Sequence, residues 1–317
     1  MDKKTAAYLL ASLLERAQRD GGAGSVSSHE IKALRLAVQA LDPDTELPAL
    51  VGTSPPGSSP GSATATTAAS AQAASTPPNP PELPIVKLVV DSLQQSEPSD
   101  EDVLLCLDFG TAMSKAFASL APDEYLDLEL GAAAGRSGYT LPSSVFIADD
   151  GKVYFGQEAI ERSEGLTDSG RQRLDSIKAW LSQQTEGNLD GDARVLQKSW
   201  NPTAFKLTQG DLIRIYLAYL TDIANQALSV YEVHGKEVGR YVKRRFARPC
   251  WPDQAQTKWA DKLMRTMLAE AQVLADTFSD RWAGGISVAE LKAALEQVRR
   301  LPSRPDYLIG DSVPEPV

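Results

Sequence analysis

The stretch 103-VLLCLDFGTAMSKAFASL-120 carries the sharpest structural signal in the chain. An apolar run delivers Asp108 at its end, the chain turns through residues 109–113, and a second extended run begins near Ser114. Gly110 can take φ > 0 and lets a ligand approach the backbone closely. The N–H groups that follow the glycine can converge into a concave anion site, and they belong to Thr111, Ala112 and Met113.

Two interpretations of this stretch stay open on its own residues. One is a β-hairpin with a polar turn. The other is a phosphate-binding turn in which Asp108 holds Mg²⁺ through coordinated waters, since that ion keeps much of its hydration.

Strand and helix signals alternate from residue 85 onward, which predicts an α/β fold class. Six strands are expected, at Ile85–Val90, Val103–Phe109, Ser114–Leu120, Ser144–Ala148, Lys152–Phe155 and Tyr241–Ala247. Apolar residues at spacings of three and four predict three long helices. One follows Thr208 with Asp211 at a capping position, one runs through 259–278, and one starts at Ser287 with Glu290 three residues later.

The first 84 residues have a different character. Leucines at helical spacing predict helices over 4–19 and 28–41, so residues 1–46 are expected to form a helical hairpin. Between Leu47 and Pro81 no residue is charged, and the stretch consists mainly of Ser, Thr, Ala, Pro and Gly. Such a composition buries too little apolar area to offset its ordering entropy, so 47–84 is predicted to be a disordered linker. Residues 85–317 then form the main domain.

Composition excludes several classes of protein. With 32 basic against 42 acidic side chains, the net charge of −10 argues against a nucleic-acid partner. Two cysteines and two histidines give neither a disulfide framework nor a zinc cluster. No apolar run approaches the roughly 20 residues that span a bilayer, so no membrane partner is expected. No small-residue cleavage site follows the apolar run Ala6–Leu14, and the expected compartment is the cytoplasm.

Residues 103–120 resemble the first phosphate-binding motif of the superfamily that joins actin, sugar kinases and the seventy-kilodalton heat-shock chaperones. Residues 139–163, YTLPSSVFIADDGKVYFGQEAIERS, look like a stretch of the chaperone branch in which a Pro-Ser-x-Val strand precedes a Gly-x-x-Ala segment. The matching residues are Pro142, Ser143, Val145, Gly156 and Ala159.

Later segments continue the resemblance in the same order. Asp175–Leu181, with Lys178, is similar to the family's lysine-bearing segment, and the helix from Thr208 is similar to the helix before its next core strand. Arg248-Pro249-Cys250-Trp251 stands where the family has a proline followed by an aromatic residue, ahead of a long helix. Residues 307–317, YLIGDSVPEPV, look like the strand and Glu-Pro that enter the next helix.

The resemblance covers 103–317 and implies the first lobe of an actin-like ATPase fold, a mixed sheet flanked by helices with a small peripheral subdomain. It implies an ATP-dependent protein-folding chaperone that binds and hydrolyses ATP with Mg²⁺ and takes unfolded polypeptide or co-chaperone-like proteins as partners. By resemblance, Asp108 would order the metal waters and Glu315 would lie near the attacking water. The phosphate would be cradled by Gly110, Thr111, Ala112 and Met113. The residues do not identify a protein partner for the amino-terminal helices.

Three departures from the family pattern weaken the expected activity. Ala112 replaces the family's second threonine, and Ile160 stands where the chaperone branch has a lysine that reaches the terminal phosphate. The chain stops two residues after Glu315, so we expect a truncated or catalytically weakened member. One alternative is a non-catalytic scaffold built on a degenerate lobe. Another is an actin-like filament or partition protein, which shares the turn but not the Gly-x-x-Ala and Glu-Pro context.

The basic run between Lys236 and Arg248 has few interleaved aromatic residues. In an acidic chain, we expect this run to be a solvated face rather than a nucleic-acid site.

Overall fold

The computed structural model describes residues 81–121, 124–166, 169–182, 189–248 and 253–314. Contacts divide the chain into two units, residues 1–77 and 78–317, and all the described residues belong to the second. The predicted helical hairpin and the linker up to residue 80 lie outside the described residues. Pro249, Cys250 and Trp251 of the segment 248–251 also lie outside the described residues, and so does Glu315, the predicted catalytic acid.

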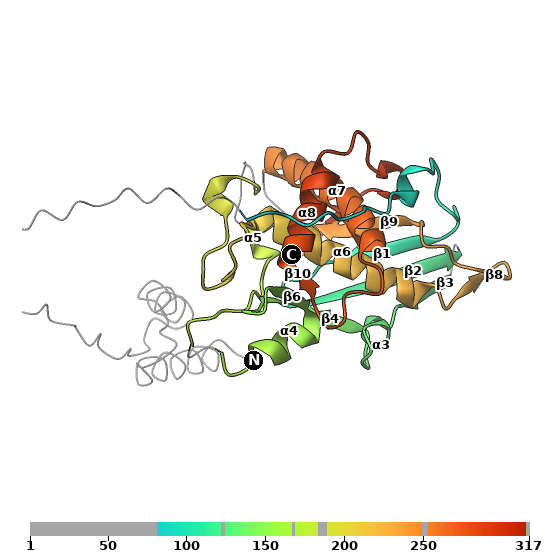
Figure 1. Ribbon diagram of the computed structural model, residues 1–317. Coiled ribbons are helices and arrows are strands. Elements are labelled where there is room, and N and C mark those ends of the chain that lie inside the picture. Colours follow the sequence, from blue (N-terminus) through green and yellow to red (C-terminus); the bar gives the residue numbers. More distant parts are fainter. Residues whose placement is uncertain (1–80, 122–123, 167–168, 183–188, 249–252, 315–317) are drawn as a thin grey trace, which may run out of the picture. The chain divides into compact units, whose positions relative to one another are not determined.

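A mixed β-sheet lies at the centre of this unit (Figure 1). Its strands follow the order β11 (Val313–Pro314), β9 (Lys243–Arg248), β1 (Leu104–Asp108), β2 (Met113–Ala121) and β3 (Glu124–Asp127), with β4 (Thr140–Pro142) also paired to β2. The first three strands in the chain, β1, β2 and β3, are antiparallel neighbours. β9 lies parallel to β1, and β11 lies parallel to β9. Each parallel connection needs a crossover, which the long helices supply.

One face of the sheet is packed and the other is more exposed, as the alternation of side chains requires. Leu105 and Leu107 of β1 are buried with Ala118 of β2, whereas Cys106 is half-buried and Phe117 is 41% exposed. The buried face belongs to the main hydrophobic core, which includes the apolar residues of α6 (Gln209–Leu228) and α7 (Gln254–Thr277). The chain is therefore a mixed α/β structure whose mixed sheet is flanked by helices, as predicted.

A smaller sheet sits apart from the central one. It contains β10 (Ile286–Ser287), β6 (Lys152–Phe155) and β5 (Val145–Ile147), and α4 (Gly156–Ser163) packs against it. The remaining elements are α3 (Leu130–Ala133), α5 (Ala179–Ser182), α8 (Val288–Arg299), the hairpin of β7 (Glu232–Val233) and β8 (Lys236–Glu237), and 3-10 turns at Asp91–Leu93, Asp192–Arg194 and Asp306–Leu308.

One local prediction is wrong, and two are confirmed only in part. Residues 85–90 are not a strand, because side chains rather than a neighbouring strand satisfy their backbone: Thr277 Oγ1 accepts from Val89 N–H and Gln297 donates to Val86 O. Ser287 is the N-cap residue of α8, as predicted, but its side chain forms no cap hydrogen bond, and Glu290 pairs with Arg281. In the described part of 307–317, the strand is limited to Val313–Pro314.

The basic run is only partly a solvated face. Arg244 is fully buried on β9, and Arg240 pairs with Asp222 and with Asp276 at 2.7 Å. Lys243 and Arg245 are exposed, as predicted. The strand alternation explains the split, because Arg244 faces the helices while its two neighbours face solvent.

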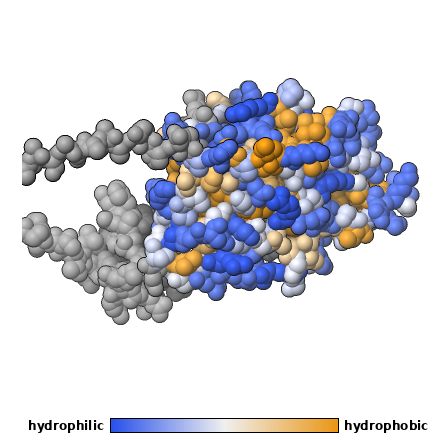
Figure 2. All heavy atoms as spheres, in the orientation of Figure 1, coloured by the Kyte–Doolittle hydropathy of each residue, from blue (hydrophilic) through white to orange (hydrophobic). Residues whose placement is uncertain are grey.

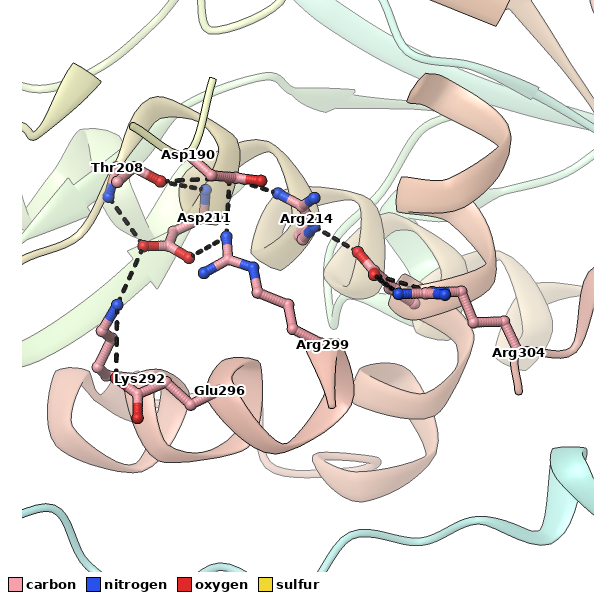
Figure 3. Close-up of polar contacts among 9 residues, drawn as sticks. Asp190, Thr208, Asp211, Arg214, Lys292, Glu296, Arg299 and Arg304 are labelled. Atoms are coloured by element: carbon pink, nitrogen blue, oxygen red, sulfur yellow. Dashed lines mark hydrogen bonds and ion pairs between the residues drawn. The ribbon is translucent and has the colours of Figure 1, made fainter. Parts of the chain in front are cut away.

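A buried charge network joins α6, α7, α8 and the segment after α8 (Figure 3). Thr208 and Asp211 form the predicted capping box at the start of α6, and Asp211 also accepts from Arg299 at 2.6 Å. Glu270 of α7 pairs with Arg214 and, at 2.8 Å, with Arg304. The network fixes the amino-terminal end of α6 against the two other long helices.

The surface seen in Figure 2 is mostly hydrophilic, with hydrophobic residues in separate patches. Large exposed apolar side chains include Phe117, Tyr125 and Val313 of the central sheet. Across the part of the chain that the structure describes, no helix is long and apolar enough to cross a membrane.

Candidate functional site

The turn between β1 and β2 lies at the carboxyl end of β1, next to the ends of β9 and β11. Asp108 closes β1, and the antiparallel register pairs it with Lys115. Gly110 N–H donates to Asp108 O at 3.0 Å, which begins the turn. In sheets with parallel strands, ligands bind outside the carboxyl ends of those strands, so this edge is the expected place for a site.

The close packing of the backbone at the turn, rather than a ligand, requires glycine at position 110. A Cβ at this position would lie 1.9 Å from the carbonyl oxygen of Met113, which no side chain can tolerate. The φ angle of Gly110 is not positive, so the glycine does not adopt the left-handed conformation that the sequence allows. The glycine lets β1 and β2 approach each other closely at the turn.

The residues that follow Gly110 lie at the surface. Thr111 and Ala112 are exposed, and Met113 is 40% exposed. Among the described residues, no acceptor takes the N–H of Thr111 or of Ala112. The turn therefore presents unpaired donors to solvent, which is the property an anion site needs.

Ser143 holds the turn from the core side. Its hydroxyl donates to Gly110 O at 2.8 Å, and its backbone N–H donates to Ala112 O at 2.8 Å. Behind it, Ser114 Oγ lies 2.9 Å from Ser143 Oγ, and the Tyr216 hydroxyl donates to Ser114 Oγ at 3.0 Å. Burial raises the pKa of Tyr216 to about 12, so its hydroxyl stays protonated and remains a donor. The sequence indicates Ser143 only as part of a motif, and no local pattern points to its contact with the turn.

The Gly-x-x-Ala segment forms the start of α4, and both matched residues have structural reasons. Gly156 has φ +58°, and a Cβ there would lie 3.0 Å from the Tyr219 hydroxyl. Ala159 is fully buried against Phe146 and Tyr154. Ile160 follows as a half-buried residue, so α4 carries no positive charge at this position.

The segment with Lys178 packs beside the turn. Lys178 is 3% exposed, and its Nζ lies 5.8 Å from the ring centroid of Phe109, the residue before Gly110. Asp175 accepts from Ser144 at 2.7 Å and from Arg173. Burial alone would raise the pKa of Asp175, but the hydrogen bonds from Arg173 and Ser144 outweigh it and lower the pKa.

A groove of about 990 Å³ opens near Met113. Aromatic side chains from β6, α6 and the loop after α7 form its wall: Phe155 stacks on Tyr219 at 5.1 Å, and Trp282 meets Phe155 edge-on at 5.3 Å. Its rim carries charged residues, including the Arg136–Glu161 pair at 2.8 Å. The groove is a second place where a small molecule could lie. Its charged lining residues are two arginines and three carboxylates, so its net charge does not favour an anion: Arg136, Arg162, Glu158, Glu161 and Asp280.

Of the predicted site residues, the structure brings together the five that belong to the turn. These are Asp108, Gly110, Thr111, Ala112 and Met113. Glu315 lies outside the described residues. Within the described ranges, no group of three or more His, Cys, Asp or Glu side chains could hold a metal ion. Asp108 is the carboxylate of the turn, which suits an ion held through its own waters rather than by a protein cage.

No protein-family model and no curated protein matches the chain. The geometry of the turn is therefore the basis for assigning a function.

Proposed function

We propose that the turn 108–113 binds the phosphates of Mg²⁺–ATP and that the chain is an ATP-binding lobe of the actin-like, heat-shock-chaperone type. The observation that carries this proposal is that two exposed residues after Gly110, Thr111 and Ala112, have backbone N–H groups with no acceptor among the described residues, at the carboxyl end of a parallel strand. Neutral N–H donors in such an arrangement favour an anion.

The strand and helix order supports the actin-like fold. Three antiparallel strands are followed by α6, a strand parallel to β1, α7, and a further parallel strand. This is the order in which the resembling segments stand in the family. The resemblance implies a small peripheral subdomain, and the small sheet with α4 is the part of the chain that we propose for it.

Asp108 is the residue proposed to hold the metal. Mg²⁺ keeps several waters and commonly uses one or two carboxylates together with substrate phosphates, so one aspartate beside the turn is sufficient. The bound ion would neutralise phosphate charge, while the N–H groups of Thr111 and Ala112 would orient the phosphate oxygens. By resemblance, the coupled activity is the binding of unfolded polypeptide.

A second candidate function is a scaffold that binds nucleotide without hydrolysing it. Ile160 and Ala112 favour this alternative, because they remove a cation and a hydroxyl that the resembling ATPases place at the phosphate. One lost donor in a preorganised site costs about 10²-fold in rate. Phosphate release measured beside binding separates the two candidates: binding without release supports the scaffold.

The first test is calorimetric titration of Mg²⁺–ATP into the chain and into Gly110→Val. The valine side chain would displace the Met113 carbonyl and open the turn, so we expect saturable binding in the unsubstituted chain and at least a tenfold loss in the variant. Ala112→Thr is the comparison within the same turn, because it restores the hydroxyl of the resembling family without requiring that displacement, and we expect it to bind at least as well as the unsubstituted chain.

Circular dichroism must show that Gly110→Val keeps the helices of the unsubstituted chain. Equal affinity in a folded Gly110→Val variant would remove the turn from the phosphate site. Absence of saturable binding in the unsubstituted chain would contradict the proposed function itself.

A further inference from the structure

Three buried hydroxyl groups form a chain of hydrogen bonds that ends on the turn 108–113. Ser143 Oγ donates its proton to Gly110 O, so toward Ser114 it acts as the acceptor. Ser114 Oγ then uses its own proton on Ser143 and accepts from the Tyr216 hydroxyl at 3.0 Å, the shorter of that hydroxyl's two contacts. Each hydroxyl donates in the same direction, and Tyr216, Ser114 and Ser143 are all fully buried.

The end of this chain fixes a peptide plane. All described peptide bonds are trans, so the C=O and N–H of one peptide unit point in opposite directions. Because Ser143 draws Gly110 O toward the core, the N–H of Thr111 must point away from it, toward solvent. The backbone N–H of Ser143 holds Ala112 O in the same way, which sets the direction of the Met113 N–H.

We propose that Ser143 is a positioning residue that aims the Thr111 N–H at the bound phosphate, an inference that rests on the proposed function. The aligned hydroxyls behind Ser143 polarise the Gly110–Thr111 peptide and make its N–H a better donor. Ser143 touches neither phosphate nor metal, and it acts through the turn alone. Ser144, its neighbour, is buried as well but donates to Asp175 and not to the turn.

The test compares Ser143→Ala with Ser144→Ala in the full chain, using Mg²⁺–ATP as the probe in calorimetry. We expect Ser143→Ala to weaken binding about tenfold and Ser144→Ala to change it less than twofold. Tyr216→Phe removes the first donor of the chain while keeping the ring, and we expect a smaller loss than for Ser143→Ala. This variant also keeps the inference testable if Ser143→Ala does not fold.

A second measurement gives the orientation of the Gly110–Thr111 peptide plane without any ligand. Residual dipolar couplings report the direction of each N–H bond. In Ser143→Ala the Thr111 coupling should change, whereas the Met113 coupling should not, because the backbone bond from Ser143 to Ala112 O is retained. A merely destabilising substitution would move both couplings or neither.

The outcomes separate the two proposals. Unchanged affinity together with an unchanged Thr111 coupling in Ser143→Ala overturns the positioning role and leaves the proposed function standing. Lack of ATP binding in the unsubstituted chain overturns the proposed function, and the orientation of the turn is then judged by the Thr111 coupling alone. If that coupling also stays unchanged, both proposals fall.

Discussion

The carbonyl oxygen of Met113 occupies the place that a Cβ on Gly110 would need. Glycine at this position therefore permits the close approach of β1 and β2 at the turn. The sequence correctly indicates a glycine turn at the end of an apolar strand. It does not indicate why the glycine is needed, because the close approach is between two backbone segments and depends on the strand register.

Arg244 is the least expected residue of the core. It is 0% exposed, and among the described residues its Nε and Nη1 have no hydrogen-bond partner. Burial lowers the pKa of Arg244 to about 10, because the charged form is disfavoured away from water. The ordinary pKa of arginine is higher. Burying the charged guanidinium therefore costs stability at every pH below the folded pKa, including neutral pH.

We therefore expect Arg244→Met to raise the free energy of unfolding, by up to about 3 kcal/mol. Methionine fills a similar volume without a charge that needs solvation. Urea unfolding at pH 7 measures the change, with the exposed Arg245→Met as the control. A loss of stability in Arg244→Met alone would show that the guanidinium has a partner or a role that its burial does not suggest.

Asp175 supplies a pH-dependent prediction. Its pKa is lowered in the folded chain, so the charged carboxylate stabilises the fold at pH values above the ordinary aspartate range of about 3.9. That stability is lost as the pH falls through the lower folded pKa. We expect Asp175→Asn to melt at a lower temperature than the unsubstituted chain at pH 7 and at nearly the same temperature near pH 2. A difference that stays constant across this range would contradict the assignment.

At the level of the elements, the three long helices depend on buried charge pairs as well as apolar packing (Figure 3). Glu270 of α7 is 1% exposed and holds Arg214 of α6 and Arg304. Removing one partner of a buried pair leaves the other charges uncompensated.

We expect Glu270→Gln to lower the free energy of unfolding by about 3 kcal/mol. Glu161→Gln is the matched control, because Glu161 pairs with Arg136 at the surface and such pairs contribute less than about 1 kcal/mol. Denaturant unfolding of the two variants compares them directly. Equal effects would mean that the network does not hold the helices together.

The elements differ in how well the sequence predicts them. The long helices carry apolar residues at spacings of three and four and a true capping box at Thr208, so the sequence predicts their positions within a few residues. It predicts neither β3 nor β4, because β3 is mostly exposed and β4 has only three residues, which leaves no alternation to read. Ile85–Val90 has the apolar composition of a strand, but its backbone is bonded by helix side chains.

In the molecule as a whole, the order of the strands and helices along the chain says more about the position of the candidate site than any single element does. The three antiparallel strands and two later parallel strands bring the ends of β1, β9 and β11 to one edge of the sheet. The sequence places the turn residues at the end of an apolar run but cannot place that end beside β9. The hydroxyl chain through Ser143 also joins residues 102 positions apart, beyond the reach of local patterns.

Phosphate is proposed to bind at the turn rather than in the groove lined by Tyr219 and Trp282. Backbone amide NMR of the full chain during titration with Mg²⁺–ATP distinguishes the two places, since each N–H reports its own surroundings. We expect the largest shift changes at Thr111, Ala112 and Met113. Changes centred on Trp282 and its indole N–H, with the three turn amides unmoved, would contradict binding at the turn.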